Sequence, residues 1–160
     1  MKIPVHSLAA ALAQIVCFGV CLCGCVTQQM KDMQMIEDFK RNTSGQYQSD
    51  GGAQLFMVPV QSRMVTDESI YVERHDANGV VVGRLLDLKI SADGKKVLQA
   101  ALTFTQEGQW RNLRENPELF TALLPKDVRP AGTCDIQPAA DQNSVSYSCG
   151  GSKPELFIRR

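Results

Sequence analysis

Histidine is scarce in this chain of 160 residues, which contains two, His6 and His75. No cluster of histidine, cysteine and carboxylate residues has metal-ligand spacing, so the sequence predicts no metal site. The chain also lacks the arrangement of a serine or cysteine nucleophile with its histidine base, and it lacks a glycine-rich phosphate loop. We therefore predict no catalytic residue, and the sequence implies no cofactor.

An excess of positive charge is absent as well. The 17 lysine and arginine residues are balanced by 17 aspartate and glutamate residues, and they form no basic stripe. Because affinity for nucleic acid depends on basic patches, nucleic acid is not an expected partner. The chain has no internal repeats, and its length allows one ordinary domain.

The longest apolar run is too short for a comfortable membrane span, which takes roughly 20 residues. It extends from Leu8 to Leu22, and Gln14 is its one clearly polar residue. Lys2 precedes the run and small residues follow it, which is typical of an export signal. The alternative is an N-terminal anchor helix that is not cleaved.

The end of this run reads Leu22-Cys23-Gly24-Cys25, which resembles the bacterial lipobox. We therefore predict that residues 1–24 are a lipoprotein signal peptide and that Cys25 becomes the lipid-bearing N-terminus, a membrane anchor. Val26 follows instead of the aspartate that resembles an inner-membrane retention signal. The resemblance thus implies the outer membrane of the cell envelope, facing the periplasm.

Residues 25–44 are predicted to be the lipidated tether. The middle has helical character, because Met35, Ile36 and Phe39 make a small apolar stripe. Met30, Met33 and Met35 also allow a copper site built from thioethers. Since neither histidine nor cysteine completes such a site, we interpret the methionines as packing or tether residues.

Cys134 and Cys149 are the only cysteines after residue 25. An even pair in an exported chain favours a disulfide over two free thiols. A nucleophilic cysteine is disfavoured because His75 is the only histidine left after cleavage of the signal peptide. We predict a Cys134–Cys149 disulfide.

Alternation of apolar and polar residues predicts a mainly β domain over residues 45–160. Turn-forming residues separate the expected strands at 76–79 and 91–94. Pro59 indicates a sheet edge or a bend. Residues 110–124 interrupt the pattern and predict one short helix or two turns, starting at Pro117 after Asn116. The strands themselves are expected to begin at Gly45 and to span residues 53–61, 69–75, 80–90, 95–106, 133–137, 144–149 and 155–159.

About eight antiparallel strands of this size close into a barrel that holds packed side chains or one small ligand.

Motifs along residues 45–160 resemble, in their order, those of the CpcT/CpeT family of calycin-like barrels, whose best-known members attach bilin chromophores to phycobiliproteins. The matching segments are Gly45-Gln-Tyr47 with Ser49 and Gln54, Val58-Pro59-Val60, Ile70-Tyr71-Val72-Glu73, Leu124–Val128, Gly132-Thr-Cys134, Cys149 and Leu156-Phe157-Ile158. The resemblance implies a calycin-like antiparallel β-barrel and a lyase-like activity on a bilin or tetrapyrrole. One stretch departs from the family: after Tyr-Val-Glu, only Arg84 remains of the Pro-Tyr-Arg-Gln-Arg-like segment of the chromophore-handling members.

Four residues are candidate ligand-binding residues. Glu73 and Arg84 lie on adjacent predicted strands, where a pair pointing into the barrel would recognise an anionic or planar ligand. Tyr71 lies near them, and Trp110 is expected at the barrel mouth, where it packs or stacks on a ligand. The alternative for Glu73 and Arg84 is a structural cross-strand pair. His75 is interpreted as an exposed loop residue.

The leading hypothesis is a lipid-anchored envelope lipoprotein whose barrel binds a small apolar ligand or a protein partner without turnover. The alternatives are a chromophore lyase-like enzyme and a structural envelope lipoprotein with no pocket.

Overall fold

The computed structural model describes residues 27–62, 68–106 and 113–160. The expected signal peptide, the lipidation site Cys25 and the candidate Trp110 lie outside these residues. The chain divides into two compact units, residues 1–35 and residues 36–160, and the second contains the whole barrel. Within the described ranges, no helix combines the length and apolar character that crossing a membrane requires.

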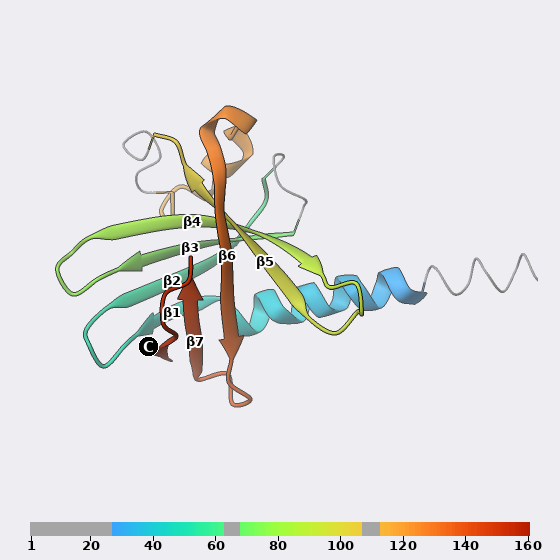
Figure 1. Cartoon of the computed structure of the whole chain (residues 1–160), viewed down its shortest axis with the longest axis horizontal. Helices are drawn as coiled ribbons and strands as arrows, with labels where there is room; N and C mark the ends of the chain where they lie inside the picture. Colours follow the sequence, from blue (N-terminus) through green and yellow to red (C-terminus); the bar gives the residue numbers. More distant parts are fainter. Residues whose placement is uncertain (1–26, 63–67, 107–112) are drawn as a thin grey trace, which may run out of the picture. The chain divides into compact units, whose positions relative to one another are not determined.

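Eight antiparallel strands close into a barrel in which each strand pairs with the next and β8 returns to β1 (Figure 1). This confirms the predicted mainly β class and the expected strand number. The strands are β1 (Gly45–Gln48), β2 (Gln54–Val60), β3 (Ser69–His75), β4 (Val81–Ile90), β5 (Val97–Phe104), β6 (Val128–Pro138), β7 (Ser144–Cys149) and β8 (Glu155–Arg159).

Side-chain hydrogen bonds close the tight turn between β3 and β4. The Asp76 carboxylate accepts hydrogen bonds from the backbone amides of Asn78 and Val80, both at 2.8 Å. Gly79 follows with a φ of 81°, a conformation that glycine adopts without steric cost. The predicted turn at residues 76–79 therefore forms for the local reason that its composition indicated.

Prolines lie in two of the strands: Pro59 in β2, and Pro130 and Pro138 in β6. Pro59 is in register with Ile70 of β3, and the pairing of β1 with β2 ends at Met57, so β1 does not pair with this end of β2, which agrees with the predicted edge or bend. Pro130 lies within β6, which starts five residues before the expected start of this strand at Thr133. The pairing of β5 with β6 shifts register between Ala100 and Leu102. Such a bulge leaves a residue unpaired and accommodates proline beside it.

The barrel interior holds one continuous cluster of buried side chains drawn from all eight strands. Alternate residues of each strand point inward, as the pleat requires. The largest buried members are Tyr47, Leu55, Met57, Ile70, Val72, Leu86, Leu88, Ile136, Val145, Tyr147 and Phe157. Ile36 and Phe39 join this cluster, so two of the three residues of the predicted apolar stripe pack against the barrel.

Residues 27–43 form a helix that ends immediately before β1. Its last carbonyl groups bond to the barrel, because the Tyr47 hydroxyl donates to the Thr43 carbonyl at 3.0 Å and Arg159 donates to the Asn42 carbonyl at 3.1 Å. A cation is favourable at a helix C-terminus, where unpaired carbonyls concentrate negative potential. The C-terminal end of the expected tether is thus a fixed part of the barrel unit.

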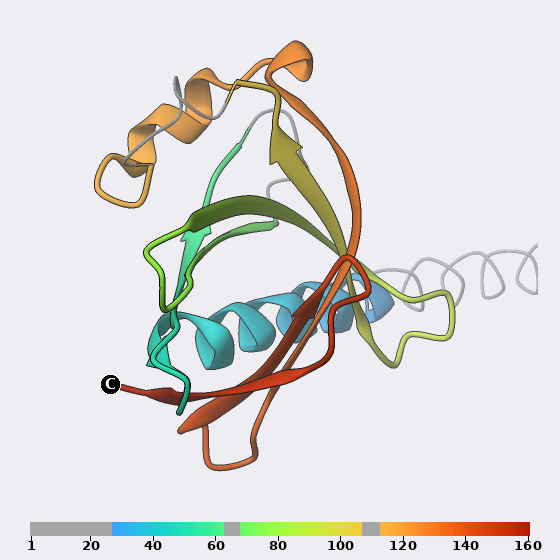
Figure 2. The same ribbon diagram turned by 60° about the vertical axis from the view of Figure 1, so that its left-hand side comes forward.

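A second apolar cluster lies on the outer face of β2 to β5. The connection from β5 to β6 returns over this face, and Figure 2 shows its helical turns, in orange, on the side of the green strands away from the cyan helix. Leu113, Phe120 and Leu123 are buried there against residues of the sheet, which are Val60, Tyr71, Leu85 and Phe104. The predicted short helix is two 3-10 turns, η1 (Pro117–Ala122) and η2 (Pro125–Asp127).

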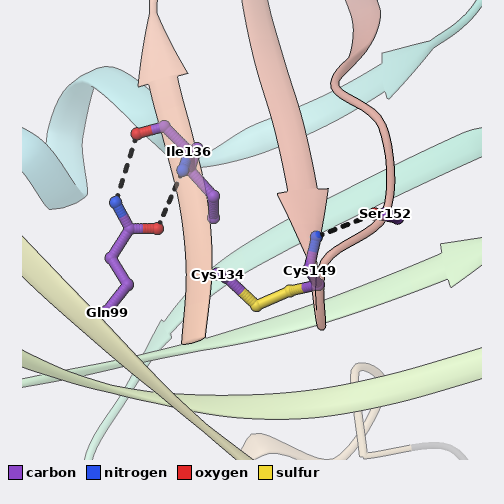
Figure 3. The surroundings of a disulfide bond; sticks show 5 residues. All are labelled: Gln99, Cys134, Ile136, Cys149 and Ser152. Carbon is purple, nitrogen blue, oxygen red and sulfur yellow. Dashed lines mark hydrogen bonds between the residues drawn. A yellow bond between two sulfur atoms is a disulfide. The ribbon is translucent and has the colours of Figure 1, made fainter. Parts of the chain in front are cut away.

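A disulfide joins Cys134 to Cys149, which are directly opposite each other on β6 and β7 (Figure 3). The predicted pairing is confirmed. Closing a loop of this length stabilises a protein by about 3 kcal/mol in the chain-entropy account. Figure 3 also shows Gln99 of β5 beside β6, with its side-chain amide bonded to the backbone of Ile136 at 3.0 and 3.2 Å.

Candidate functional site

The candidate residues of β3 alternate between the two faces of the sheet. Tyr71, Glu73 and His75 point to the outer face, whereas Val72 and Arg74 point to the barrel interior. The register places Gly83 opposite Glu73 and Arg84 opposite Val72. Arg84 therefore points inward and Glu73 outward.

For this reason the cross-strand contact considered for Glu73 and Arg84 does not form. The two residues sit on adjacent strands, as predicted, but one step of register separates their faces. No bulge interrupts the pairing of β3 and β4 at Gly83. The structure therefore separates the candidates into an outer cluster and an inner cluster.

Glu73 is the centre of the outer cluster. Its carboxylate accepts a hydrogen bond from the Tyr71 hydroxyl at 2.9 Å and lies 2.6 Å from His75 Nε2. A guanidinium nitrogen of Arg114 lies 3.7 Å away. The Glu73 residue is 7% exposed, so these contacts compensate for the loss of water around a buried carboxylate.

Arg114 and Phe56 complete the outer cluster. The Arg114 guanidinium lies over the Phe56 ring at 4.0 Å, and the His75 ring lies 5.2 Å from the same ring. Sequence reasoning did not find Arg114, because it belongs to the irregular connection after β5 and no local pattern links it to β3. His75 is also not the exposed loop residue that we expected: it ends β3, and its side chain is 29% exposed.

Gly83 makes room for the Tyr71 hydroxyl. A Cβ atom at position 83 would lie 2.6 Å from the Tyr71 hydroxyl oxygen and 3.2 Å from the nearest ring carbon. Because Gly83 is opposite Glu73, the missing side chain leaves the tyrosine free to reach the carboxylate. A glycine in this strand therefore reflects close packing of a side chain.

The three tyrosines of the chain are predicted to resist ionisation. Burial raises the pKa of Tyr71 far above its usual value, and the neighbouring Glu73 charge raises it further. Burial also raises the pKa of Tyr47 and of Tyr147.

Because these pKa values are raised by folding, the protonated tyrosines stabilise the folded protein. This stabilisation is fully present below the pKa of an unfolded tyrosine, about 10, and is lost as the pH rises through the pKa values of the folded state. Denaturation at stepwise alkaline pH should show this loss, which should be shallower in Tyr71→Phe. Normal ionisation of all three in an absorbance titration would contradict it.

The inner cluster lies at one end of the barrel interior. Arg74 of β3 forms an ion pair of 2.9 Å with Glu155 of β8. The positive charge of Arg84 of β4 acts on the Tyr147 hydroxyl of β7, where it partly offsets the rise in pKa that burial causes. Two strands separate β3 from β8, so the Arg74–Glu155 ion pair crosses the interior.

The inner cluster is accessible and carries more positive than negative charge. The side chains of Arg74 and Glu155 are 32% and 35% exposed. Val82 is opposite Arg74 on the same face of the sheet, and it is 39% exposed. The cluster thus has two guanidinium groups, one carboxylate and one phenol beside an exposed valine. Such a set can bind a ligand in which an anionic group adjoins an apolar surface.

Neither cluster resembles a metal centre. In the parts of the chain that the structure describes, no three histidine, cysteine or carboxylate side chains converge. The donors of both clusters are guanidinium, phenol and imidazole groups, which suit hydrogen bonding to oxygen. Binding rather than metal chemistry is the property that these side chains support.

Comparisons with family models, with curated proteins and with solved structures returned no match to this chain.

Proposed function

We propose that this chain is an envelope lipoprotein, anchored through Cys25, whose barrel binds a small amphipathic ligand without turnover. The observation that carries the proposal is the inner cluster, where Arg84 and Arg74 accompany the exposed Val82 at one end of the interior. Arg84 is the proposed binding residue, because it points into the interior and its positive charge lies near the Tyr147 phenol, whose pKa burial raises.

The lipobox-like segment supports the anchor and the compartment. A disulfide between Cys134 and Cys149 fits an oxidising compartment such as the periplasm. The absence of aspartate after Cys25 supports the outer membrane as the location of the protein. A permanent lipid anchor holds the binding domain at the membrane surface.

The motif resemblance to the CpcT/CpeT family supports a tetrapyrrole as one ligand class. Such molecules combine a flat apolar body with carboxylates, which matches arginine beside valine. The lyase-like alternative is not favoured by the geometry, because Glu73 and Arg84 act on opposite faces. Binding without bond formation is therefore the proposed activity.

A structural role is the second candidate function. It is favoured by the interior cluster itself, in which side chains from all eight strands are buried, the large ones among them almost completely. If those side chains fill the interior, a ligand can occupy only the end formed by the inner cluster. The binding experiment separates the two functions.

Biliverdin and oleate, added to the full-length protein in detergent micelles, test the proposal. We expect saturable binding of at least one probe, with about tenfold or greater weakening in Arg84→Gln, because a charge-assisted hydrogen bond is lost. Arg129→Gln, which removes an exposed arginine of β6, is the matched control and should bind normally. No binding of either probe would favour the structural role, and a covalent biliverdin adduct would favour the lyase.

The anchor has a separate test. Mass spectrometry of the mature N-terminal peptide should find acylated Cys25, and Cys25→Ser should release the protein from the membrane. An unprocessed N-terminus would overturn this part of the proposal.

A further inference from the structure

Arg114 of the outer cluster is placed by stacking rather than by hydrogen bonding. Its guanidinium lies 4.0 Å from the centre of the Phe56 ring. Among the described residues, the nearest carboxylate oxygens, of Glu73 and Glu115, are 3.7 and 3.8 Å away. Both distances exceed the range of an N–H···O hydrogen bond. With 30% of the side chain exposed, its planar fork of donors is held in position for an acceptor.

His75 contacts the same Phe56 ring and the same Glu73 carboxylate as this guanidinium, and Val81 shares the face of the sheet with His75. His75 Nε2 is engaged by Glu73 at 2.6 Å, and the ring contacts Phe56, so its orientation is fixed. Val81 is directly opposite His75 and is 50% exposed. Side chains of directly opposed residues lie close together on one face of a sheet. An anion bound to Arg114 and His75 would therefore have an apolar surface beside it.

The charge of Glu73 limits which anion can bind. Its carboxylate oxygen Oε1 lies 3.7 Å from a guanidinium nitrogen of Arg114 and 2.6 Å from Nε2 of His75. A dianion would be repelled by this buried charge more strongly than a monoanion would. A planar carboxylate also matches the geometry of a guanidinium fork.

We propose that Arg114, His75 and Val81 form a second binding site, on the outer face of the barrel, for a monocarboxylate that carries a short apolar group. Arg114 holds the carboxylate, His75 orients it, and Val81 contacts the apolar group. The site uses no residue of the inner cluster and does not depend on the proposed interior ligand.

Acetate, butyrate and inorganic phosphate, titrated into the full-length protein at constant ionic strength, are the probes. The readouts are the NMR signals of the Arg114 side chain and the His75 ring. We expect saturable shifts with acetate, and butyrate should bind about three- to tenfold more tightly because of its two additional methylene groups. Phosphate should bind more weakly than acetate.

Four variants assign the contributions. Arg114→Gln should abolish saturable binding, and Arg114→Lys should weaken it because an ammonium lacks the fork. Val81→Ser should preserve acetate binding and remove the preference for butyrate. Arg84→Gln should bind both carboxylates normally, which separates this site from the interior one. Unsaturable shifts, equal binding of phosphate, or unchanged binding in a folded Arg114→Gln variant would overturn the proposal.

Discussion

Replacing Phe120 with alanine is expected to lower the free energy of unfolding by about 3–5 kcal/mol, the usual cost of removing a buried phenylalanine. The Phe120 side chain is completely buried, and its ring centre lies 5.0 Å from that of Tyr71. In the described part of the connection between β5 and β6, it is one of three buried side chains that pack onto the outer face. The loss should appear as a lower midpoint in urea denaturation.

Leu119→Ala is the matched control for this prediction. Leu119 precedes Phe120 in the same 3-10 turn and is 37% exposed, so its truncation leaves a much smaller cavity. We expect a loss of less than about 1 kcal/mol, since fully burying a leucine side chain is worth roughly 1.5–3 kcal/mol. Similar losses in the two variants would contradict the idea that burial of Phe120 fastens this segment.

Replacing Gln99 with leucine is expected to lower the free energy of unfolding by about 2–4 kcal/mol, because two buried backbone groups lose their partners. The Gln99 side-chain amide donates to the Ile136 carbonyl and accepts from the Ile136 amide. Gln99 is 6% exposed, so water does not readily replace these bonds. Chemical denaturation measures the loss.

Two further variants test whether the lost hydrogen bonds cause the destabilisation: Gln99→Glu removes one of them, and Gln137→Leu is the control. Glutamate keeps the size of Gln99 but cannot donate to the Ile136 carbonyl while it is ionised, so this variant should also be destabilised. Gln137 is the next residue after Ile136 and is exposed, so leucine at this position should change stability by no more than about 0.5 kcal/mol. A Gln99→Leu variant as stable as the parent would show that the ladder between β5 and β6 does not need this amide.

The inner and outer clusters share β3, and this strand explains why they are separate. Arg74 reaches Glu155 through the interior, while its neighbours Glu73 and His75 bond to each other outside. The sheet lies between them, so a substitution on one face removes no direct contact on the other. This separation makes the two binding experiments independent.

Much of the fold could be predicted from local sequence signals. The Asp76 to Gly79 turn and the strand over residues 69–75 follow from turn chemistry and alternation, which act within a few residues. The cysteine pair was predictable because the other four cysteines all lie within residues 17–25. The early start of β6 was not, because Pro130 opposes strand structure locally and only a bulge against β5 accommodates it.

The candidate site was only half predictable. Sequence alone determined that Tyr71 and Glu73 share one face of a strand, since alternation has a fixed period of two. The tertiary structure decided that this face is the outer one, that Arg84 lies inside, and that Arg114 approaches from a distant connection. The physical reason is that strand register and chain closure depend on contacts between residues far apart in sequence, and a one-residue step reverses the face of every side chain.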